Sequence, residues 1–233
     1  MTSSQTQTLA RISLTRQPVA VAFLSAPPPG LERVDGPAPA SCSYWKRASE
    51  GGAFYTTADD HQNCPVGAFT HGVELPPAKA AELESLVGTM IQLQYLRSEE
   101  IPLLPHRRQP MQVAAYAPLD RATFDADVVV FRGNAMQIML LSEAARAAGA
   151  FESATTMGRP ACAMLPHAID TSGSVASVGC IGNRVYTGLG DDELYLSVPG
   201  SALDATLEKL DTILTANIEL EKFHRQRAAT LAS

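Results

Sequence analysis

Four cysteines are the residues of this chain whose type and placement point most directly to chemistry. They are Cys42, Cys64, Cys162 and Cys180, and each lies in a short segment of small, turn-forming or aromatic residues. A free cysteine is usually a small buried hydrophobe, and its reactivity decides whether it matters. Four cysteines at predicted turns instead indicate a shared site with soft ligands.

An iron–sulfur cluster is the group that this pattern favours. Such clusters are held by cysteine thiolates, and glycines nearby let backbone amides approach the sulfides. Gly179 and Gly182 flank Cys180, and Pro65 follows Cys64. We therefore predict a cluster of the 4Fe–4S type with Cys42, Cys64, Cys162 and Cys180 as ligands, and redox or Lewis-acid chemistry beside it.

Other sites fit the same residues. Zinc sites usually use closely spaced cysteine pairs, which this chain lacks, but a non-catalytic zinc or heme-binding module is the main alternative. A metal-free thiol enzyme and four unrelated buried thiols are further alternatives. With three cysteine ligands one iron would be open to a substrate, whereas four ligands would close the cluster; the spacing does not choose between them.

Three polar residues near the cysteines are candidate anchors for a small anionic or sulfur-containing molecule. Asn183 and Arg184 follow Cys180 closely, and Lys46 lies one helical turn after Cys42. Arginine binds carboxylates and phosphates through two parallel hydrogen bonds, and a lysine can lower the pKa of a thiol. The alternatives are an ion pair between Arg184 and the acidic run after it, and an ordinary surface lysine at position 46.

Two histidines and three aromatic residues are weaker candidates. His61 and His71 lie on either side of Cys64 and are candidate metal ligands or proton donors, because histidine titrates near neutral pH. A single histidine in a loop is more often structural. Tyr44, Trp45 and Tyr186 are suited to walling a pocket or shielding a cluster, although aromatic residues more often belong to the core.

Composition limits the functional class. The chain has 233 residues, a net charge of −6 and 45% hydrophobic residues, which is typical of a globular protein and argues against binding to a nucleic-acid backbone. The longest apolar runs, such as Val19–Leu24 and Val128–Phe131, are too short to cross a membrane. We expect a cytoplasmic protein that binds a small molecule and works with a redox partner protein or a second copy of itself.

The order of predicted elements indicates an α/β fold. Expected strands or extended segments cover 19–24, 68–75, 111–116, 127–131, 184–187 and 193–198. Expected helices cover 44–49, 78–95, 135–150 and 202–227. Two prolines precede the second of these helices, and Pro199-Gly200 precedes the last, as proline is favoured at a helix start.

The chain also divides into two loosely similar halves. The first, 1–110, holds Cys42 and Cys64, and the second, 111–233, holds Cys162 and Cys180. Cys64 and Cys180 are both followed by a glycine within three residues, then by a threonine, and by another glycine at the eighth position. We interpret this as an ancient duplication within one inseparable globular unit, and the alternative is that turns simply reuse glycine and threonine.

Several segments around the cysteines resemble one prokaryotic family. They read SCSYWK from Ser41, HQNCPVG from His61, GRPACA from Gly158 and GCIGNRVYTGL from Gly179. These strings, with YAPL from Tyr116, are similar to the family called domain of unknown function 169, and the resemblance runs from about Leu9 to Arg227. It supports the integrity of the cysteine set and implies no particular ligand or reaction.

Overall fold

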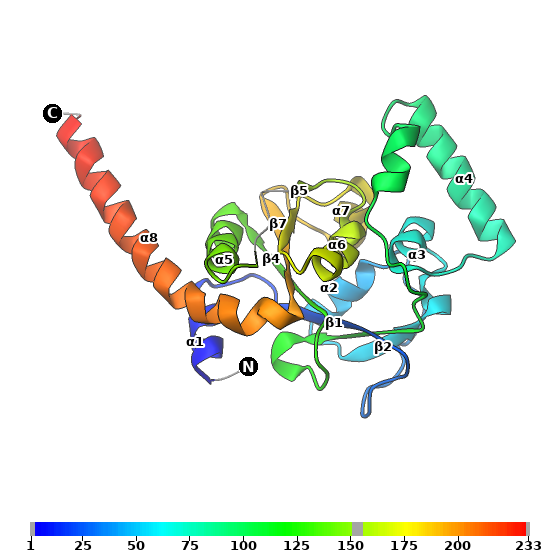
Figure 1. The fold of residues 1–233 in the computed structure, drawn as a ribbon, viewed down its shortest axis with the longest axis horizontal. Coiled ribbons are helices and arrows are strands. Elements are labelled where there is room, and N and C mark those ends of the chain that lie inside the picture. The colour runs from blue at the N-terminus through cyan, green and yellow to red at the C-terminus, as the bar shows by residue number, and fades with distance from the viewer. Residues whose placement is uncertain (1–2, 151–155, 232–233) are drawn as a thin grey trace.

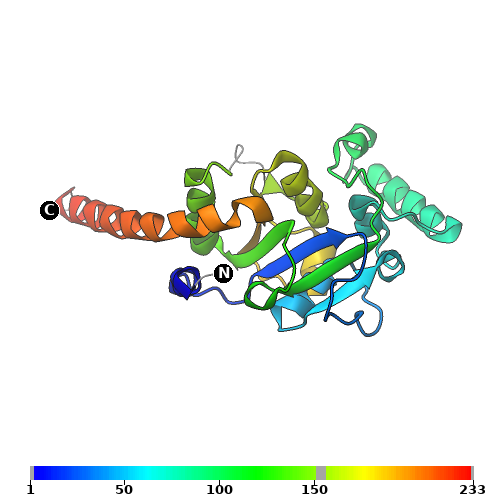
Figure 2. The ribbon, with the colours of Figure 1, turned by 60° about the horizontal axis from the view of Figure 1, so that its bottom comes forward.

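The protein is described by a computed structural model covering residues 3–150 and 156–231, and its centre is one mixed sheet. The strand order is β2-β3-β1-β4-β7-β6-β5, and every neighbouring pair is antiparallel except β5 with β6. The strands are β1 (Val19–Leu24), β2 (Phe54–Thr57), β3 (Val113–Pro118), β4 (Val128–Asn134), β5 (Thr156–Met157), β6 (Val175–Ser177) and β7 (Glu193–Pro199). Figure 2 shows β1 and β3 side by side within this sheet.

Both faces of the sheet are covered, which explains why its central strands are continuous apolar runs. Successive side chains of a strand point to opposite faces. In β4, Val128 and Val130 belong to one core and Val129 and Phe131 to the other. The strands expected at 19–24, 127–131 and 193–198 are confirmed. Their apolar runs predicted them because a strand buried on both faces needs apolar residues along its length.

Different helices cover the two faces. The first core receives side chains of α2 (Ser43–Ser49), α3 (Pro65–His71) and α6 (Met164–Thr171). The second receives those of α1 (Ser3–Arg11), α5 (Ala135–Ala147) and the first part of α8 (Leu203–Leu231). The α/β prediction is confirmed, and the cysteine-bearing segments lie on the α2–α3–α6 face.

Two segments expected to be extended are helical instead. Residues 68–75 fall partly in α3, which begins at Pro65 after its N-cap Cys64 and ends at Gly72 in the left-handed conformation (φ 69°). Residues 184–187 belong to α7 (Ile181–Thr187), which ends at Gly188 with φ 63°. The extended prediction was wrong because each helix is only seven residues long and its capping residues, not its apolar period, define it.

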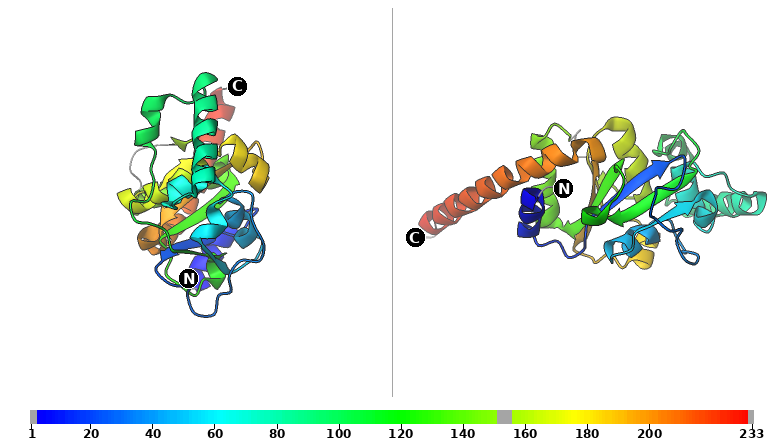
Figure 3. Two further views of the ribbon diagram at one scale, coloured as in Figure 1. Left: turned by 90° about the vertical axis from the view of Figure 1, so that its right-hand side faces the viewer. Right: turned by 90° about the horizontal axis from the view of Figure 1, so that it is seen from below.

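Two helices project from opposite ends of the molecule. Figure 1 and the right-hand view of Figure 3 show α4 (Pro77–Gln92) at one end and the distal part of α8 at the other. α4 contains no buried residue, and every residue from 218 to 230 of α8 is exposed. In the part of the chain that the structure describes, no helix has the length and apolar character needed to cross a membrane.

The remaining elements are short 3-10 helices. They are η1 (Ala58–His61), η2 (Ser98–Leu103), η3 (Leu119–Arg121), η4 (Ala161–Ala163) and η5 (Gly200–Ala202). η3 follows Pro118 (φ −53°, ψ 138°) and η5 follows Pro199 (φ −54°, ψ 138°), so β3 and β7 end in the same way. Leaving β5 aside, the sheet begins with β2, β3 and β1 at one end and with β6, β7 and β4 at the other. The two sets of three strands have the same order when β2 is matched with β6, β3 with β7 and β1 with β4.

The match between these two sets of three strands does not follow the predicted boundary at residue 110. β3 lies within 111–233 but pairs with β1 and β2 of 1–110, so the sheet runs on across the predicted boundary. In the matching of strands, β3 belongs with β1 and β2. The duplication itself remains a prediction.

Candidate functional site

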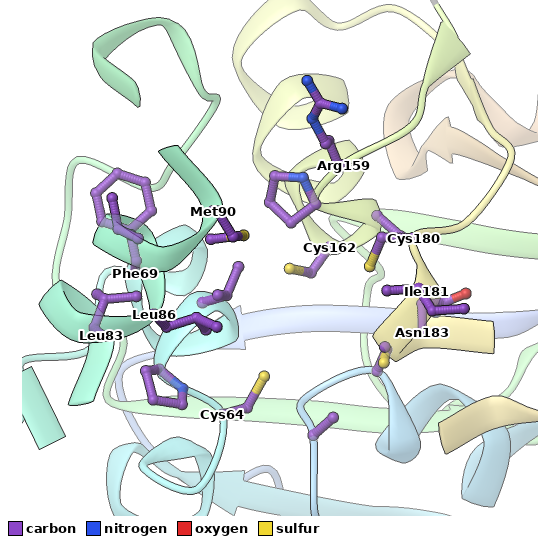
Figure 4. A pocket seen from close by; sticks show the side chains of 18 of the residues that line it. Cys64, Phe69, Leu83, Leu86, Met90, Arg159, Cys162, Cys180, Ile181 and Asn183 are labelled. Atoms are coloured by element: carbon purple, nitrogen blue, oxygen red, sulfur yellow. The ribbon is translucent and has the colours of Figure 1, made fainter. Parts of the chain in front are cut away.

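All four cysteines line one cavity of about 550 Å³. In Figure 4 the sulfur atoms of Cys64, Cys162 and Cys180 point into the same space, and side chains of α4 face them. All four are free cysteines. The fold therefore brings together side chains that lie as far apart in the sequence as residues 42 and 180.

Three of the four cysteines stand at the starts of helices. Cys42, Cys64 and Cys180 are the N-caps of α2, α3 and α7, and Cys162 lies in η4 just before α6. The first backbone N–H groups of a helix have no partner within the helix, and its N-terminus carries a partial positive charge. Of the three, only Cys64 has a side chain that accepts a capping hydrogen bond, so this environment favours an anionic sulfur most directly at Cys64.

Gly67 allows the closest approach around Cys64. Its backbone N–H donates a hydrogen bond to Cys64 Sγ over 3.3 Å. A Cβ at this position would lie 2.3 Å from Ser41 Oγ and 2.9 Å from Cys64 Sγ. A side chain larger than hydrogen would therefore displace one of these neighbours.

Burial controls the two innermost thiols. It raises the pKa of Cys42 to about 12, although the nearby Asn183 carboxamide opposes this rise. The pKa of Cys162 is also raised well above its usual value, first by burial and then by the thiol of Cys64. Without a neighbouring positive charge, these two groups are neutral thiols at physiological pH.

Asn183 lines the cavity and is almost fully buried, with 2% of its surface exposed. Among the described residues, neither Nδ2 nor Oδ1 makes a hydrogen bond of normal geometry. Buried polar groups normally have a partner. Its carboxamide is thus available to a bound group or to the Cys42 sulfur.

The structure places the other two predicted anchors outside the cavity lining. Lys46 Nζ lies 2.7 Å from Glu50 Oε1. The Arg184 guanidinium donates to the carbonyls of Gly190 and Val178 and lies 3.8 Å from Asp191. Both side chains already have partners in the fold.

The two histidines are buried beside the cavity but do not line it. His61 Nδ1 and Nε2 each lie 2.9 Å from a hydroxyl, of Ser41 and Thr56 respectively. Burial lowers the pKa of His61 to about 3. Burial also lowers the pKa of His71, whose ring packs at 5.3 Å from that of His61. Both are neutral structural groups.

An apolar wall opposite the thiols is the part of the site that the sequence did not indicate. α4 and the segment after it contribute Leu83, Leu86, Val87, Met90, Tyr95, Leu96, Ile101 and Leu104. The apolar face of α4 was visible in the sequence, but such a face usually packs against a core. Of the aromatic candidates, Tyr186 lines the cavity, whereas Tyr44 and Trp45 belong to the core.

The four thiols supply soft ligands to this cavity. Over residues 3–150 and 156–231, no three His, Cys, Asp or Glu side chains are arranged around a single metal position. The thiols instead surround a volume, and their chemistry is that of soft ligands for iron or copper(I) and zinc. Cys42, Cys64, Cys162 and Cys180 are the residues that would hold such a group.

Comparison with known proteins gives a distant relative and a family. The chain is 26% identical over 165 residues to an uncharacterised protein, MJ0308, of Methanocaldococcus jannaschii, covering 67% of this chain and 69% of that protein. No solved structure matches it. The family model of DUF169, described as uncharacterised ArCR, matches residues 10–209. With the cysteine segments inside that match, this chain belongs to the DUF169 family.

Proposed function

We propose that this protein holds an iron–sulfur cluster through Cys42, Cys64, Cys162 and Cys180 and binds a small molecule beside it. The observation that carries the proposal is the convergence of all the cysteines of the chain on one cavity. Unrelated buried thiols would be expected in separate parts of the core.

A bound metal would change the protonation state of these thiols. Cys42 and Cys162 are buried, and burial raises the pKa of each. A cationic metal centre reverses this effect, because a coordinating thiol is deprotonated outright. The helix N-termini at Cys42, Cys64 and Cys180 add favourable partial charge for thiolates.

The same shifts argue against a metal-free thiol enzyme that uses either inner cysteine. The nucleophile in thiol chemistry is the thiolate, and buried thiols in apolar surroundings are inert. With its pKa raised to about 12, Cys42 is protonated at neutral pH. Zinc and heme remain alternatives, which metal analysis separates from the cluster.

Different residues of the chain would have different roles at this site. A bound cluster would supply electron transfer or an open iron as a Lewis acid. The apolar wall of α4 would contact a bound molecule opposite the thiols, and Ile181 and Gly182, which follow Cys180, line the same cavity. Among the described residues the Asn183 carboxamide makes no hydrogen bond of normal geometry, so it would be available to a sulfur or a ligand. Free thiols suit a reducing cytoplasm, where we place the protein with a redox partner or a second copy.

The first test is metal content after purification without oxygen. We expect roughly four iron and four sulfide per chain, in line with a cubane cluster held by thiolates, and a broad brown absorption. Each of the four Cys→Ser variants should lose most of the iron. Zinc in a colourless protein, or a sharp heme band, would replace the cluster by one of the alternatives.

Ser43→Ala is the matched control for Cys42→Ser. Ser43 is the next residue, is equally buried at 7% exposure, and does not line the cavity. Its Oγ has no partner within the described chain, so its removal costs little. Iron loss in both variants would indicate a folding defect, and unchanged iron in all four cysteine variants would reject the proposal.

A further inference from the structure

The cavity beside the thiols has walls that are almost entirely apolar. Apart from the cysteines, its lining includes leucine, methionine, phenylalanine, tyrosine and isoleucine side chains. Among the described lining residues only two carry a charge, Glu84 and Arg159. The interactions of these two residues indicate whether the cavity attracts a charged ligand.

Arg159 has a carboxylate and an aromatic partner in the fold. Arg159 Nη2 donates to Glu100 Oε2 over 3.3 Å, and its guanidinium carbon lies 4.5 Å from the centre of the Tyr95 ring. Glu100 is shared with Arg97, whose Nε donates to Glu100 Oε1 over 2.9 Å. However, Arg159 and Glu84 have opposite charges, so the described lining carries no net charge to attract an anion. Glu84 is exposed on α4 and would repel an anion.

The anchors that would recognise an anion are absent from the described lining. Lys46 pairs with Glu50, and Arg184 is bound to two backbone carbonyls. Neither residue lines the cavity. The charge distribution therefore disfavours the anionic ligand that the sequence indicated.

Size and exposed surface indicate what occupies the space. The volume of about 550 Å³ lies within the range of about 300–1,000 Å³ typical of small-molecule sites. Several apolar residues at its mouth are partly open to water: Leu86 is 44% exposed, Tyr186 44% and Ile181 72%. A ligand that covers them removes apolar surface from water, which is favourable.

We infer that this cavity binds an uncharged apolar molecule with an aromatic or alicyclic ring system, between the wall of α4 and the thiols. Phe69, Tyr95 and Tyr186 offer ring contacts, and Met90 offers a polarisable thioether. The Asn183 carboxamide, which has no hydrogen bond of normal geometry among the described residues, supplies a neutral hydrogen-bonding group. The inference names the ligand class for the function proposed above and rests on it for the role of the thiols, but not for binding itself.

Two fluorescent probes that differ by one charge test this inference. N-phenyl-1-naphthylamine is an uncharged aromatic amine, and 8-anilino-1-naphthalenesulfonate has the same rings with an added sulfonate. We expect the full-length protein to bind the uncharged probe at least tenfold more tightly. Equal binding, or tighter binding of the sulfonate, would overturn the inference.

A pair of neighbouring variants locates the binding. Leu86→Asp places a carboxylate on the cavity wall, whereas Ser85→Asp places it on an exposed part of α4 that does not line the cavity. Because no residue of α4 is buried, both variants should fold, which circular dichroism would verify. We expect Leu86→Asp to weaken binding of the uncharged probe at least fivefold and Ser85→Asp to leave it unchanged. Equal effects would place the probe elsewhere and reject the site.

Iron and sulfide measured on the same samples separate the two proposals. Selective probe binding by a protein without iron would remove the cluster and keep the apolar site. An iron–sulfur protein that binds neither probe, or binds both equally, would keep the cluster and remove the apolar site.

Discussion

At the residue scale, close approach at Gly67 is as important to the site as the cysteines themselves. Cys64 Sγ accepts a hydrogen bond from the Gly67 N–H, and Ser41 Oγ occupies the space where a Cβ would stand. Ser41 in turn contacts His61 Nδ1. The position of one thiol thus depends on a residue that has no side chain and contributes only its backbone N–H.

We predict that Gly67→Ala loses most of the iron bound by the protein, because the new Cβ would lie 2.9 Å from Cys64 Sγ. Gly88→Ala is the control. Gly88 lies in α4, where an added Cβ would meet nothing within 4 Å, so alanine there should stabilise the helix by about 0.5–1 kcal/mol. Iron content and thermal unfolding measure both effects. Full iron content in Gly67→Ala would contradict the described packing at Cys64.

A second prediction at this scale concerns the buried histidines. The ring of His71 is fully buried between Phe23 and His61, and Arg107 lies over the Phe23 ring. Burial, His61 and Arg107 all lower the pKa of His71. An unfolded histidine binds a proton below about pH 6.5 whereas the folded one does not, so the stability it contributes is present above that pH and lost on acidification.

The free energy of unfolding of the wild type should fall between pH 7.5 and 5.5, and we expect this fall to be about 1.4 kcal/mol smaller in His71→Leu. This amount is the contribution of one histidine that binds a proton only in the unfolded state. Urea unfolding at the two pH values measures it. The control is His224→Gln, since His224 is exposed on the distal part of α8. If His71→Leu keeps the full pH dependence of the wild type, His71 is protonated in the folded protein and this account is wrong.

At the element scale, α8 has two parts that differ in burial. Its first part buries Leu203, Leu207, Leu210 and Leu214 against the sheet and α5, and Asn217 Nδ2 donates to Glu143. Beyond this point the helix continues into solvent, as Figure 1 shows. Packing, rather than helix propensity, stabilises the first part.

We predict that ending the chain before Glu219 changes the free energy of unfolding by less than about 1 kcal/mol, because residues 219–230 are exposed. Leu207→Ala, in contrast, should cost about 2–5 kcal/mol through the cavity it leaves. Chemical unfolding compares the two variants. A large loss on truncation would mean that the distal helix is covered in solution, and sedimentation would then identify a second copy as its partner.

At the scale of the whole molecule, the site joins parts of the chain that the sheet also joins. Cys42 and Cys64 come from the segments around β2, and Cys162 and Cys180 come from the segments around β6. α3 and α7 have the same length, a cysteine N-cap and a left-handed glycine at the C-terminus. A group held by all four thiols therefore links the two predicted halves.

We expect removal of the bound group to lower the melting temperature by about 5–10 °C. A ligand that binds only the folded state at 100 times its Kd stabilises by about 2.7 kcal/mol, and 1 kcal/mol corresponds to about 2–4 °C in a chain of this size. Differential scanning calorimetry before and after chelation and oxidation measures the change. Cys162→Ser should show no such difference, and an identical melting temperature in the wild type would mean that the group does not link the halves.

The sequence by itself determined the element types where patterning is strong, and it singled out four cysteines that the fold brings to one cavity. Continuous apolar runs predicted β1, β4 and β7, and turn-rich surroundings singled out the cysteines. Short capped helices such as α3 and α7 were not predicted, because seven residues are too few to show a helical period and because backbone geometry defines their ends.

Only the tertiary structure decided what surrounds the thiols. It directs Lys46 and Arg184 towards partners in their own segments, and it turns the apolar face of α4 towards the cavity instead of the core. Neither result follows from spacing along the chain, since both depend on which surfaces the sheet brings face to face. The cysteine set was readable because thiols are rare and chemically distinctive, whereas an apolar wall has the same composition as any core.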